Sequence, residues 1–165
     1  MEFEVLIEIT KNSSVKYELD KETNRLVVDR FLYTAMFYPF NYGFICDSLA
    51  NDGDPLDALV ITNFEIIPGA IIKCRAIGGL KMEDEAGKDE KIIAVPVEKV
   101  DPFGKRFKSI NDLDLSYKNQ IRHFFENYKT LEPGKWVKIT NWFSKSEAEK
   151  LIKKAKLNYS NKDKK

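Results

Sequence analysis

The sequence has little histidine and little cysteine. His123 is the only histidine among 165 residues, which excludes His-rich metal sites and any catalytic triad that needs a second histidine. Cys46 and Cys74 lie far apart, in apolar surroundings and without a CxxC spacing. We therefore expect two reduced thiols in the core, as is typical of cytosolic proteins, and no disulfide framework.

Long apolar runs and an excess of one charge sign are also absent. No run of about 18 apolar residues occurs, and the N-terminus has no basic-then-apolar signal, so we expect neither a membrane span nor export. The 27 basic and 26 acidic residues give a formal net charge of +1, which excludes the strong positive field of many nucleic-acid binders. We expect a cytoplasmic protein that binds neither membranes nor nucleic acid.

The composition that remains is that of one folded domain. Hydrophobic residues make up 43% and aromatic residues 12% of the chain, which is enough for a substantial core at this length. The last eight residues, NYSNKDKK, are polar. We therefore expect a single domain over residues 1–157 and a frayed C-terminal tail over residues 158–165.

The first half of the chain has the periodicity of strands. Every second residue from Phe3 to Ile9 is apolar, which places these residues on one face of a strand. The aromatic-rich segment FYPFNYGFI (37–45) is interpreted as a shaped loop that contributes to the core, and residues 100–113 as a surface loop. Further strands are predicted at residues 15–19, 26–30, 57–62, 71–79, 91–97 and 135–143.

Two helices are predicted in the second half. Apolar and aromatic residues recur at helical spacing over residues 117–128, after Ser116 as N-cap. Ser144 and Glu147 have the form of a capping box that opens a second helix through about Ala155. This order of elements indicates an α+β, mainly β domain on a twisted or closed antiparallel sheet. The pattern alone does not choose between a barrel and an open sheet.

Three carboxylates are crowded into the stretch NDGDPLDALV (51–60). Asp52, Asp54 and Asp57 repel one another unless a positive charge lies between them. Gly53 and Pro55 predict a turn, and turn carboxylates are hard oxygen donors that suit Mg²⁺ or Ca²⁺. The spacing excludes an EF-hand, which leaves a metal site or a solvated acidic turn as the two interpretations.

A second acidic group lies in KMEDEAGKDEK (81–91). EAGK (85–88) is a natural hairpin connection between two predicted strands, which would bring Asp84 and Asp89 close together at its base. A charged hairpin tip is usually just solvated. Two carboxylate groups on rigid strand ends could instead share metal ions.

Basic and phenolic side chains form the third element. Singly, each is best interpreted as a surface charge or a half-buried core tyrosine. Together with carboxylates that bind divalent metals, they would make a site for a small polyphosphate. The residues are Lys16, Tyr17, Arg30, Tyr38, Tyr42, Tyr128 and Lys129.

The motif DGDPLD (52–57) resembles the signature D-[SGDN]-D-[PE]-hydrophobic-D of the soluble family I inorganic pyrophosphatases, bacterial type. Further segments match in the family's order, namely VKYE (15–18), VDRF (28–31), TAMFYPFNYGFI (34–45), LKMEDEAGKDEKIIAVP (80–96) and HFFENYKTLEPGKWVKI (123–139). The resemblance implies an OB-like five-stranded antiparallel barrel flanked by two helices. It also implies Mg²⁺-dependent hydrolysis of pyrophosphate to two orthophosphates by a metal-activated water, without a covalent intermediate. By the same resemblance we expect a homo-oligomer, specifically a homohexamer.

The resemblance also assigns roles residue by residue. Asp54 matches the general base, and Tyr42 and Lys129 match further catalytic positions. The matching phosphate ligands are Lys16, Arg30, Tyr42, Lys91, Tyr128 and Lys129, and the matching metal ligands are Asp52, Asp57, Asp84, Asp89, Glu8 and Glu18, with Glu85 a further acidic residue of the site.

Two rival interpretations remain. A haloacid-dehalogenase-like phosphatase has a DxDx(T/V) loop after an apolar strand, but here SLAN precedes the motif and Leu56 occupies the fifth place. A non-enzymatic OB-type module that binds nucleic acid or Ca²⁺ needs a basic, aromatic-lined strand face, whereas the acidic groups around Asp52 and Asp84 dominate here.

Overall fold

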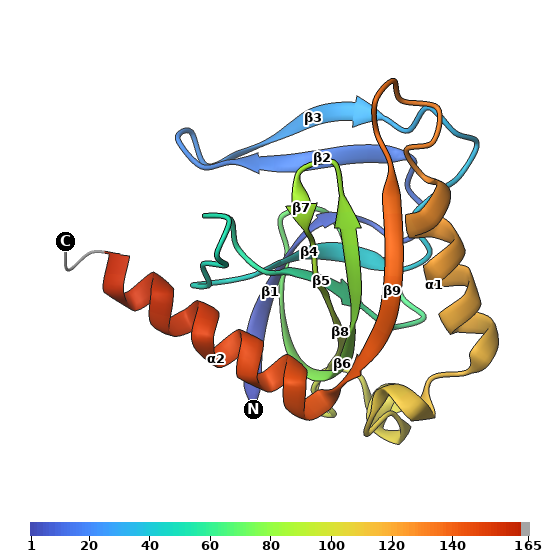
Figure 1. The fold of residues 1–165 in the computed structure, drawn as a ribbon. Helices are drawn as coiled ribbons and strands as arrows, with labels where there is room; N and C mark the ends of the chain where they lie inside the picture. Colours follow the sequence, from blue (N-terminus) through green and yellow to red (C-terminus); the bar gives the residue numbers. More distant parts are fainter. Residues whose placement is uncertain (163–165) are drawn as a thin grey trace.

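The computed structural model describes residues 1–162. It is mainly β, with two α-helices late in the chain (Figure 1). The elements in chain order are β1 (Glu2–Ile9), β2 (Val15–Asp20), β3 (Arg25–Phe31), β4 (Asn41–Ile45), β5 (Asp57–Val60), β6 (Ile71–Asp84), β7 (Gly87–Lys88), β8 (Lys91–Pro96), the 3-10 helices η1 (Pro102–Arg106) and η2 (Ile110–Asp112), α1 (Leu115–Asn127), β9 (Val137–Ser144) and α2 (Lys145–Lys162).

Five strands close into a barrel in the order β1, β4, β5, β8 and β6, and β6 pairs again with β1. The predicted barrel is confirmed, but the prediction that it is antiparallel throughout is wrong for one pair. β5 and β8 run parallel, with Asp57 beside Lys91 at the start of both strands. The chain returns to the same end through β6 and β7, which supply the long connection that a parallel pair needs.

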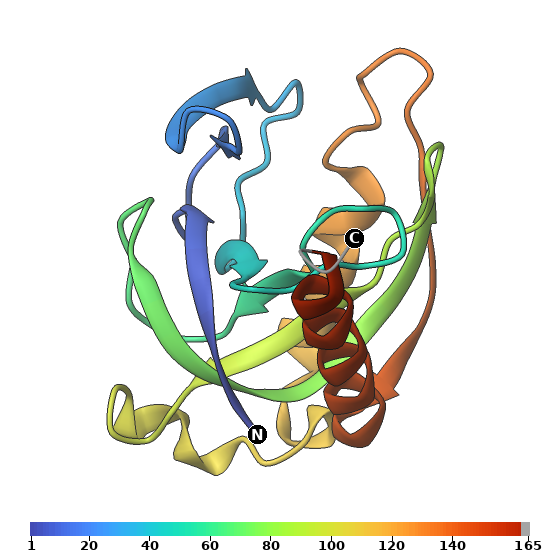
Figure 2. The same ribbon diagram turned by 90° about the vertical axis from the view of Figure 1, so that its left-hand side faces the viewer.

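Three connecting segments extend toward one end of the barrel (Figure 2). They are the β2–β3 hairpin, the turn between β6 and β7, and the loop between α1 and β9. The β2–β3 hairpin forms a two-stranded sheet separate from the barrel sheet. The predicted site residues lie at this end, so these segments position the site.

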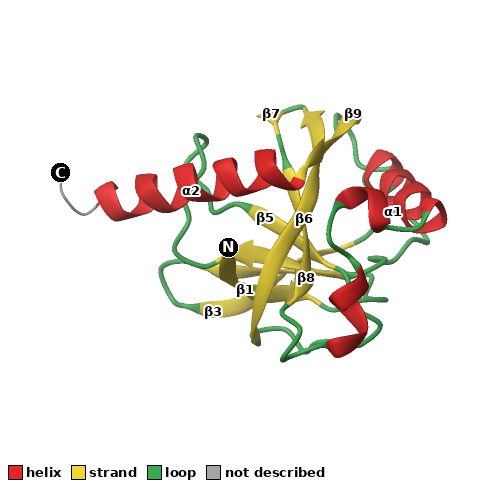
Figure 3. Cartoon of the chain, turned by 90° about the horizontal axis from the view of Figure 1, so that it is seen from below, coloured by secondary structure: helices red, strands yellow, loops and turns green. Residues whose placement is uncertain are grey.

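The buried core residues form two clusters. In β1 the residues Phe3, Val5, Ile7 and Ile9 are buried, as the alternation predicted, whereas all of β8 is buried because both of its faces are covered. α1 packs against β9 and α2 packs against β6, and Figure 3 shows the two helices on different sides of the barrel. Ile121, Phe124 and Phe125 form the buried stripe of α1.

Several predicted boundaries are wrong. Residues 41–45 form β4 rather than a loop, and Phe107, Ile110 and Leu113 are buried in a segment that was predicted to be a surface loop. α1 begins at Leu115 with Asp114 as N-cap, and Ser116 lies inside the helix. β6 continues five residues beyond the predicted end, to Asp84.

The second helix is longer than predicted. α2 continues past Ala155 to Lys162, so residues 158–162 of the expected frayed tail are helical. Tertiary contacts stabilise this end, because Lys156 donates to the carbonyl of Cys46 at 3.1 Å and Asn158 to that of Leu49 at 3.1 Å. Residues 163–165 of the predicted tail lie outside the described residues. Within residues 1–162, no helix is both long enough and apolar enough to cross a bilayer.

Candidate active site

Lys91 is the centre of the most buried charged cluster. It begins β8 beside Asp57, which begins β5, and its side chain is only 4% exposed. Lys91 Nζ donates to Asp57 Oδ2 at 2.6 Å, to Asp89 Oδ1 at 2.8 Å and to the Tyr42 hydroxyl at 2.9 Å. All three donor hydrogens of the ammonium are thereby used, and the Tyr42 hydrogen is left to donate elsewhere.

The charge states in this cluster depend on one another. Burial alone would lower the pKa of Lys91, but the nearby Asp57, Tyr42 and Asp89 raise it well above its ordinary value. Burial raises the pKa of Asp89, and the charge of Asp57 adds to the rise while Lys91 opposes it. The pKa of Tyr42 is raised well above its ordinary value, first by burial and then by Asp57. Lys91 is therefore a cation and Tyr42 a neutral phenol at neutral pH.

A second cluster forms where α1 ends near the β6–β7 turn. Lys129 Nζ lies 3.1 Å from Asp84 Oδ2 and 3.3 Å from Glu85 Oε2, and its side chain is 7% exposed. Burial opposes a low pKa at Glu85, but backbone N–H groups, Lys135 and Lys129 lower it to about 2. The backbone N–H of Asp89 donates to the carbonyl of Met82 in β6 at 2.9 Å, two residues before Asp84, which places this cluster next to the first one.

The β2–β3 hairpin contributes a third cluster. Lys16 pairs with Glu18 at 2.7 Å and with Asp29 at 3.2 Å. Arg30, opposite Lys16 in the hairpin register, pairs with Asp29 and with Glu132 of the α1–β9 loop. The structure thus brings the two predicted hairpin cations together, each already held by carboxylates.

Glu8 lies between the barrel and the hairpin. Its Oε2 accepts a hydrogen bond from the backbone N–H of Leu19 at 2.8 Å. Burial raises the pKa of Glu8 to about 7, and the charges of Asp57 and Glu18 contribute to the rise. Glu8 is therefore close to both the first and the third cluster.

The acidic turn is placed differently from the other carboxylates. Asp52 accepts from the backbone N–H of Asp54 at 3.0 Å, and Gly53 between them has the positive φ of +90° that the turn requires. The side chain of Asp54 is 68% exposed and pairs with Lys21 of the β2–β3 turn at 2.5 Å. Within residues 1–162, no hydrogen bond or ion pair joins Asp52 or Asp54 to the cluster around Lys91.

The donor set fits a hard divalent cation. The predicted metal ligands are all carboxylates, the oxygen donors that Mg²⁺ prefers. Asp57 and Asp89 already converge on one positive charge, the Lys91 ammonium. Within residues 1–162, no three side chains from Asp, Glu, His and Cys are grouped closely enough to bind a metal ion together. The chemistry of the donors therefore supports a metal, while their arrangement is that of lysine-paired carboxylates.

A family model described as inorganic pyrophosphatase matches residues 5–160 of the chain. The chain belongs to the inorganic pyrophosphatase family. Members of this family are metal-dependent enzymes that hydrolyse pyrophosphate. The family assignment, made from the sequence by resemblance, is confirmed.

The relatives cover nearly the whole inorganic pyrophosphatase chain. The enzyme of Rickettsia prowazekii is 58% identical over 153 residues, which cover 92% of this chain and 89% of that protein. The inorganic pyrophosphatase of Nanoarchaeum equitans is 55% identical, with 96% and 98% covered. The solved structure of the Helicobacter pylori enzyme has 49% identity and a TM-score of 0.94, with 96% of this chain and 94% of that chain covered.

Three residues that pair with predicted site residues, Asp29, Lys21 and Glu132, were not predicted from the sequence. Asp29 lies next to Arg30 inside the matching segment VDRF (28–31), so its position was a usable signal. Glu132 had the same kind of signal, since it lies inside the matching segment HFFENYKTLEPGKWVKI (123–139). Lys21 lies in none of the matching segments and meets Asp54 only through the tertiary fold. Of the additional predicted polar residues, Tyr17 lies in β2 and Tyr38 is fully buried with a pKa raised well above its ordinary value by burial.

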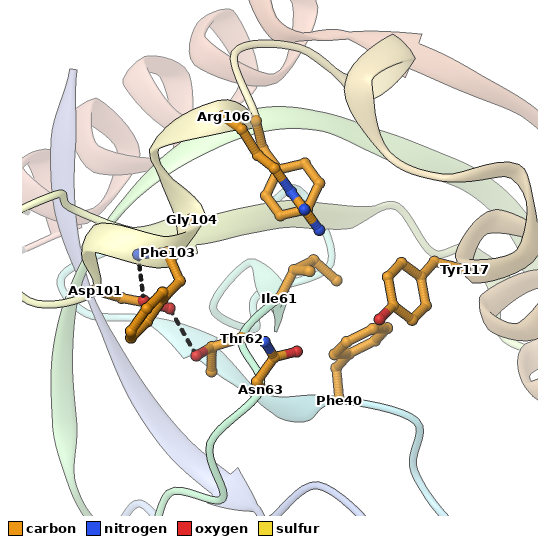
Figure 4. Close-up of a pocket in the computed structure, with 10 residues that line it drawn as sticks. Phe40, Ile61, Thr62, Asn63, Asp101, Phe103, Gly104, Arg106 and Tyr117 are labelled. Atoms are coloured by element: carbon orange, nitrogen blue, oxygen red, sulfur yellow. Dashed lines mark hydrogen bonds between the residues drawn. The ribbon is translucent and has the colours of Figure 1, made fainter.

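A separate cavity of about 200 Å³ lies beside η1 (Figure 4). The segment after β5, η1 and α1 line it, and a buried hydrogen bond of 2.8 Å from Thr62 to Asp101 closes one side. None of the predicted site residues lines this cavity. The charged end of the barrel, and not this cavity, therefore holds the residues that match the family's chemistry.

Proposed function

We propose that the chain hydrolyses inorganic pyrophosphate to two orthophosphates with Mg²⁺ and without a covalent intermediate. The single observation that carries the proposal is the Lys91 cluster, in which a buried cation holds Asp57 and Asp89 within 2.8 Å of one atom. Such an array of fixed charges suits a small, highly charged substrate. Pyrophosphate repels an anionic nucleophile until cations neutralise it.

The carboxylates would hold the metal ions. Mg²⁺, when bound, would supply positive charge to the phosphates and lower the pKa of a water molecule. Asp57 would be one of these ligands. The full set of proposed ligands is Asp52, Asp57, Asp84, Asp89, Glu8 and Glu18, with Glu85 nearby.

Asp54 is the proposed general base. Its carboxylate is exposed at the turn and can accept a proton from the attacking water. Arg30, Lys129 and Tyr128 would stabilise the phosphate that leaves, as positioned phosphoryl transfer requires. Lys16, Tyr42 and Lys91 complete the proposed set of phosphate ligands, and Tyr42 retains a free hydroxyl hydrogen for this role.

We also propose a cytoplasmic location and a homo-oligomer, specifically a homohexamer. The two free cysteines, Cys46 and Cys74, support a reducing compartment. Leu115 at the start of α1 is an exposed apolar side chain, which supports α1 as a contact between subunits. Light scattering in solution gives the mass, and a monomer at micromolar concentration would contradict the hexamer.

The deciding experiment is orthophosphate release from pyrophosphate, with Mg²⁺ and with chelator, beside an aryl phosphate as control substrate. Metal-dependent release from pyrophosphate alone is the expected result. A folded sample that releases no phosphate from pyrophosphate contradicts the proposal. Equal turnover of the aryl phosphate, with trapping of an aspartyl-phosphate, would favour the haloacid-dehalogenase-like alternative.

A further inference from the structure

Glu132 is a buried acidic residue that no sequence motif assigned to a role. It lies in the α1–β9 loop, three positions after Lys129, and is only 8% exposed. Its Oε1 lies 2.9 Å from Arg30 Nε across the gap between the loop and the β2–β3 hairpin. Carboxylates this buried are rare in folded proteins unless they are paired.

The Arg30–Glu132 pair is unusual because each residue has a buried polar atom without a hydrogen bond. Among the described residues, Arg30 Nε and Glu132 Oε2 are the buried side-chain atoms without a hydrogen bond. The contact at 2.9 Å therefore has the distance of an ion pair without the alignment of a hydrogen bond. Buried polar atoms left unsatisfied are costly to the folded state, and each one calls for an explanation other than stability.

Arg30 contacts two separate segments of the chain, its own β2–β3 hairpin and the α1–β9 loop. Its NH1 donates to Asp29 of the same hairpin, and its Nε faces Glu132 of the α1–β9 loop. Among residues 1–162, no backbone ladder joins the hairpin to the barrel sheet. Besides the Arg30–Glu132 pair, the side chain of Thr34 reaches the carbonyl of Tyr128 at 3.5 Å. The Glu132 carboxylate is thus the charged link that relates Arg30 to the loop carrying Tyr128 and Lys129.

We propose that Glu132 is a positioning residue that fixes Arg30 relative to Tyr128 and Lys129, so that the three side chains bind one phosphate group together. This inference rests on the proposed pyrophosphatase function. Asp29 cannot fix Arg30 relative to the α1–β9 loop, because Asp29 belongs to the same hairpin as Arg30 and also pairs with Lys16. Without Glu132, Arg30 stays attached to the hairpin alone and its position relative to the loop is lost.

The test is Glu132→Gln in the full-length chain, with kcat and KM for pyrophosphate measured at saturating Mg²⁺. The substitution keeps the shape and removes the charge. The expected result is a KM raised about tenfold with kcat changed less than about threefold, since the loss of a contact made equally to the bound substrate and to the transition state raises KM alone. The affinity for inorganic phosphate, measured by calorimetry, should fall in parallel.

The matched control is Glu126→Gln. Glu126 also pairs with an arginine Nε, that of Arg122, at 2.8 Å, but on the exposed face of α1. It should leave KM unchanged. An unchanged KM in Glu132→Gln would overturn the proposal. A lowered KM would overturn it too, because Glu132 would then be a competitor of phosphate for the guanidinium.

A double-mutant cycle separates positioning from a merely structural role. In the Arg30→Gln background, Glu132→Gln should have no further effect on KM, because the residue acts through Arg30. The same increase in both backgrounds would overturn the proposal. If Glu132→Gln does not fold, Glu132→Asp replaces it. This variant should still raise KM, since the shorter side chain keeps the charge but does not extend as far as Arg30. Failure of the proposed function is distinguished by the unmodified chain, which would release no phosphate.

Discussion

Lys91 Nζ lies 2.6 Å from Asp57 Oδ2, between two strands that start side by side. We predict that Lys91→Met lowers turnover of pyrophosphate about 100-fold, because a positioned cation is lost from the site. It should also lower the free energy of unfolding by about 3 kcal/mol, since Asp57 and Asp89 remain without their shared partner. Phosphate release and urea unfolding measure the two effects.

The control for Lys91 is Lys138→Met. Lys138 is an exposed strand lysine in β9, so the same substitution there should leave both turnover and unfolding nearly unchanged. Equal effects in the two variants would show that the loss at Lys91 is not specific to its cluster. A Lys91→Met enzyme with normal turnover would remove Lys91 from the proposed phosphate ligands.

Local patterns in the sequence predicted much of the fold. Strands with one buried face, such as β1, were found because their alternation is written in consecutive residues. β4 was missed, since NYGFI is buried on both faces and its aromatic residues and glycine do not alternate. The parallel pairing of β5 with β8 was missed because relative strand direction depends on the whole connection between them.

In the site, too, local patterns were predicted from the sequence and contacts made by the tertiary fold were not. DGDPLD lies within six residues, so its carboxylates could be recognised together. The Arg30–Glu132 and Lys21–Asp54 pairs join residues that are 102 and 33 positions apart, and no local pattern predicts them. The lysine pairing of Asp57, Asp84 and Asp89 was likewise not predicted, although it explains how these carboxylates lie close together without strong repulsion.

Gly43 allows β4 to approach β1. A Cβ at this position would lie 1.8 Å from the backbone oxygen of Leu6. We predict that Gly43→Ala lowers the free energy of unfolding by about 3 kcal/mol, because backbone atoms cannot move aside cheaply. It should also raise KM, since Tyr42 is the residue directly before Gly43. Gly104→Ala is the control, because its Cβ would meet nothing closer than 3.7 Å. Equal destabilisation by both would contradict the prediction.

Asp112 closes a capping box at η2 and makes stability depend on acid pH. Its side chain accepts from the backbone N–H groups of Ser109 and Lys108, each at 2.8 Å, and these bonds lower the pKa of Asp112 below its ordinary 3.8. A carboxyl with a depressed pKa in the folded state stabilises that state above the unfolded-state pKa, and this contribution disappears as pH falls through the folded-state pKa. We predict that Asp112→Asn lowers the melting temperature at pH 7.

The difference in melting temperature between Asp112→Asn and the unmodified chain should narrow as the pH falls below 3.8. Melting curves from pH 7 to pH 2 by circular dichroism measure it. Asp114→Asn is the control, since Asp114 is the N-cap of α1 but makes no capping hydrogen bond with its side chain. A constant difference across this pH range would show that the carboxylate charge of Asp112 does not contribute.

Asp54 and Asp57 should separate proton transfer from metal binding. Asp54 is exposed and its side chain pairs with Lys21, whereas Asp57 lies in the Lys91 cluster. We predict that Asp54→Asn keeps Mg²⁺ affinity but loses turnover about 100-fold, the size of a lost general base. Asp57→Asn should weaken both. Calorimetric Mg²⁺ titration and phosphate release measure the two quantities, with the exposed Asp47→Asn as control. A near-normal rate for Asp54→Asn would assign the proton to another group.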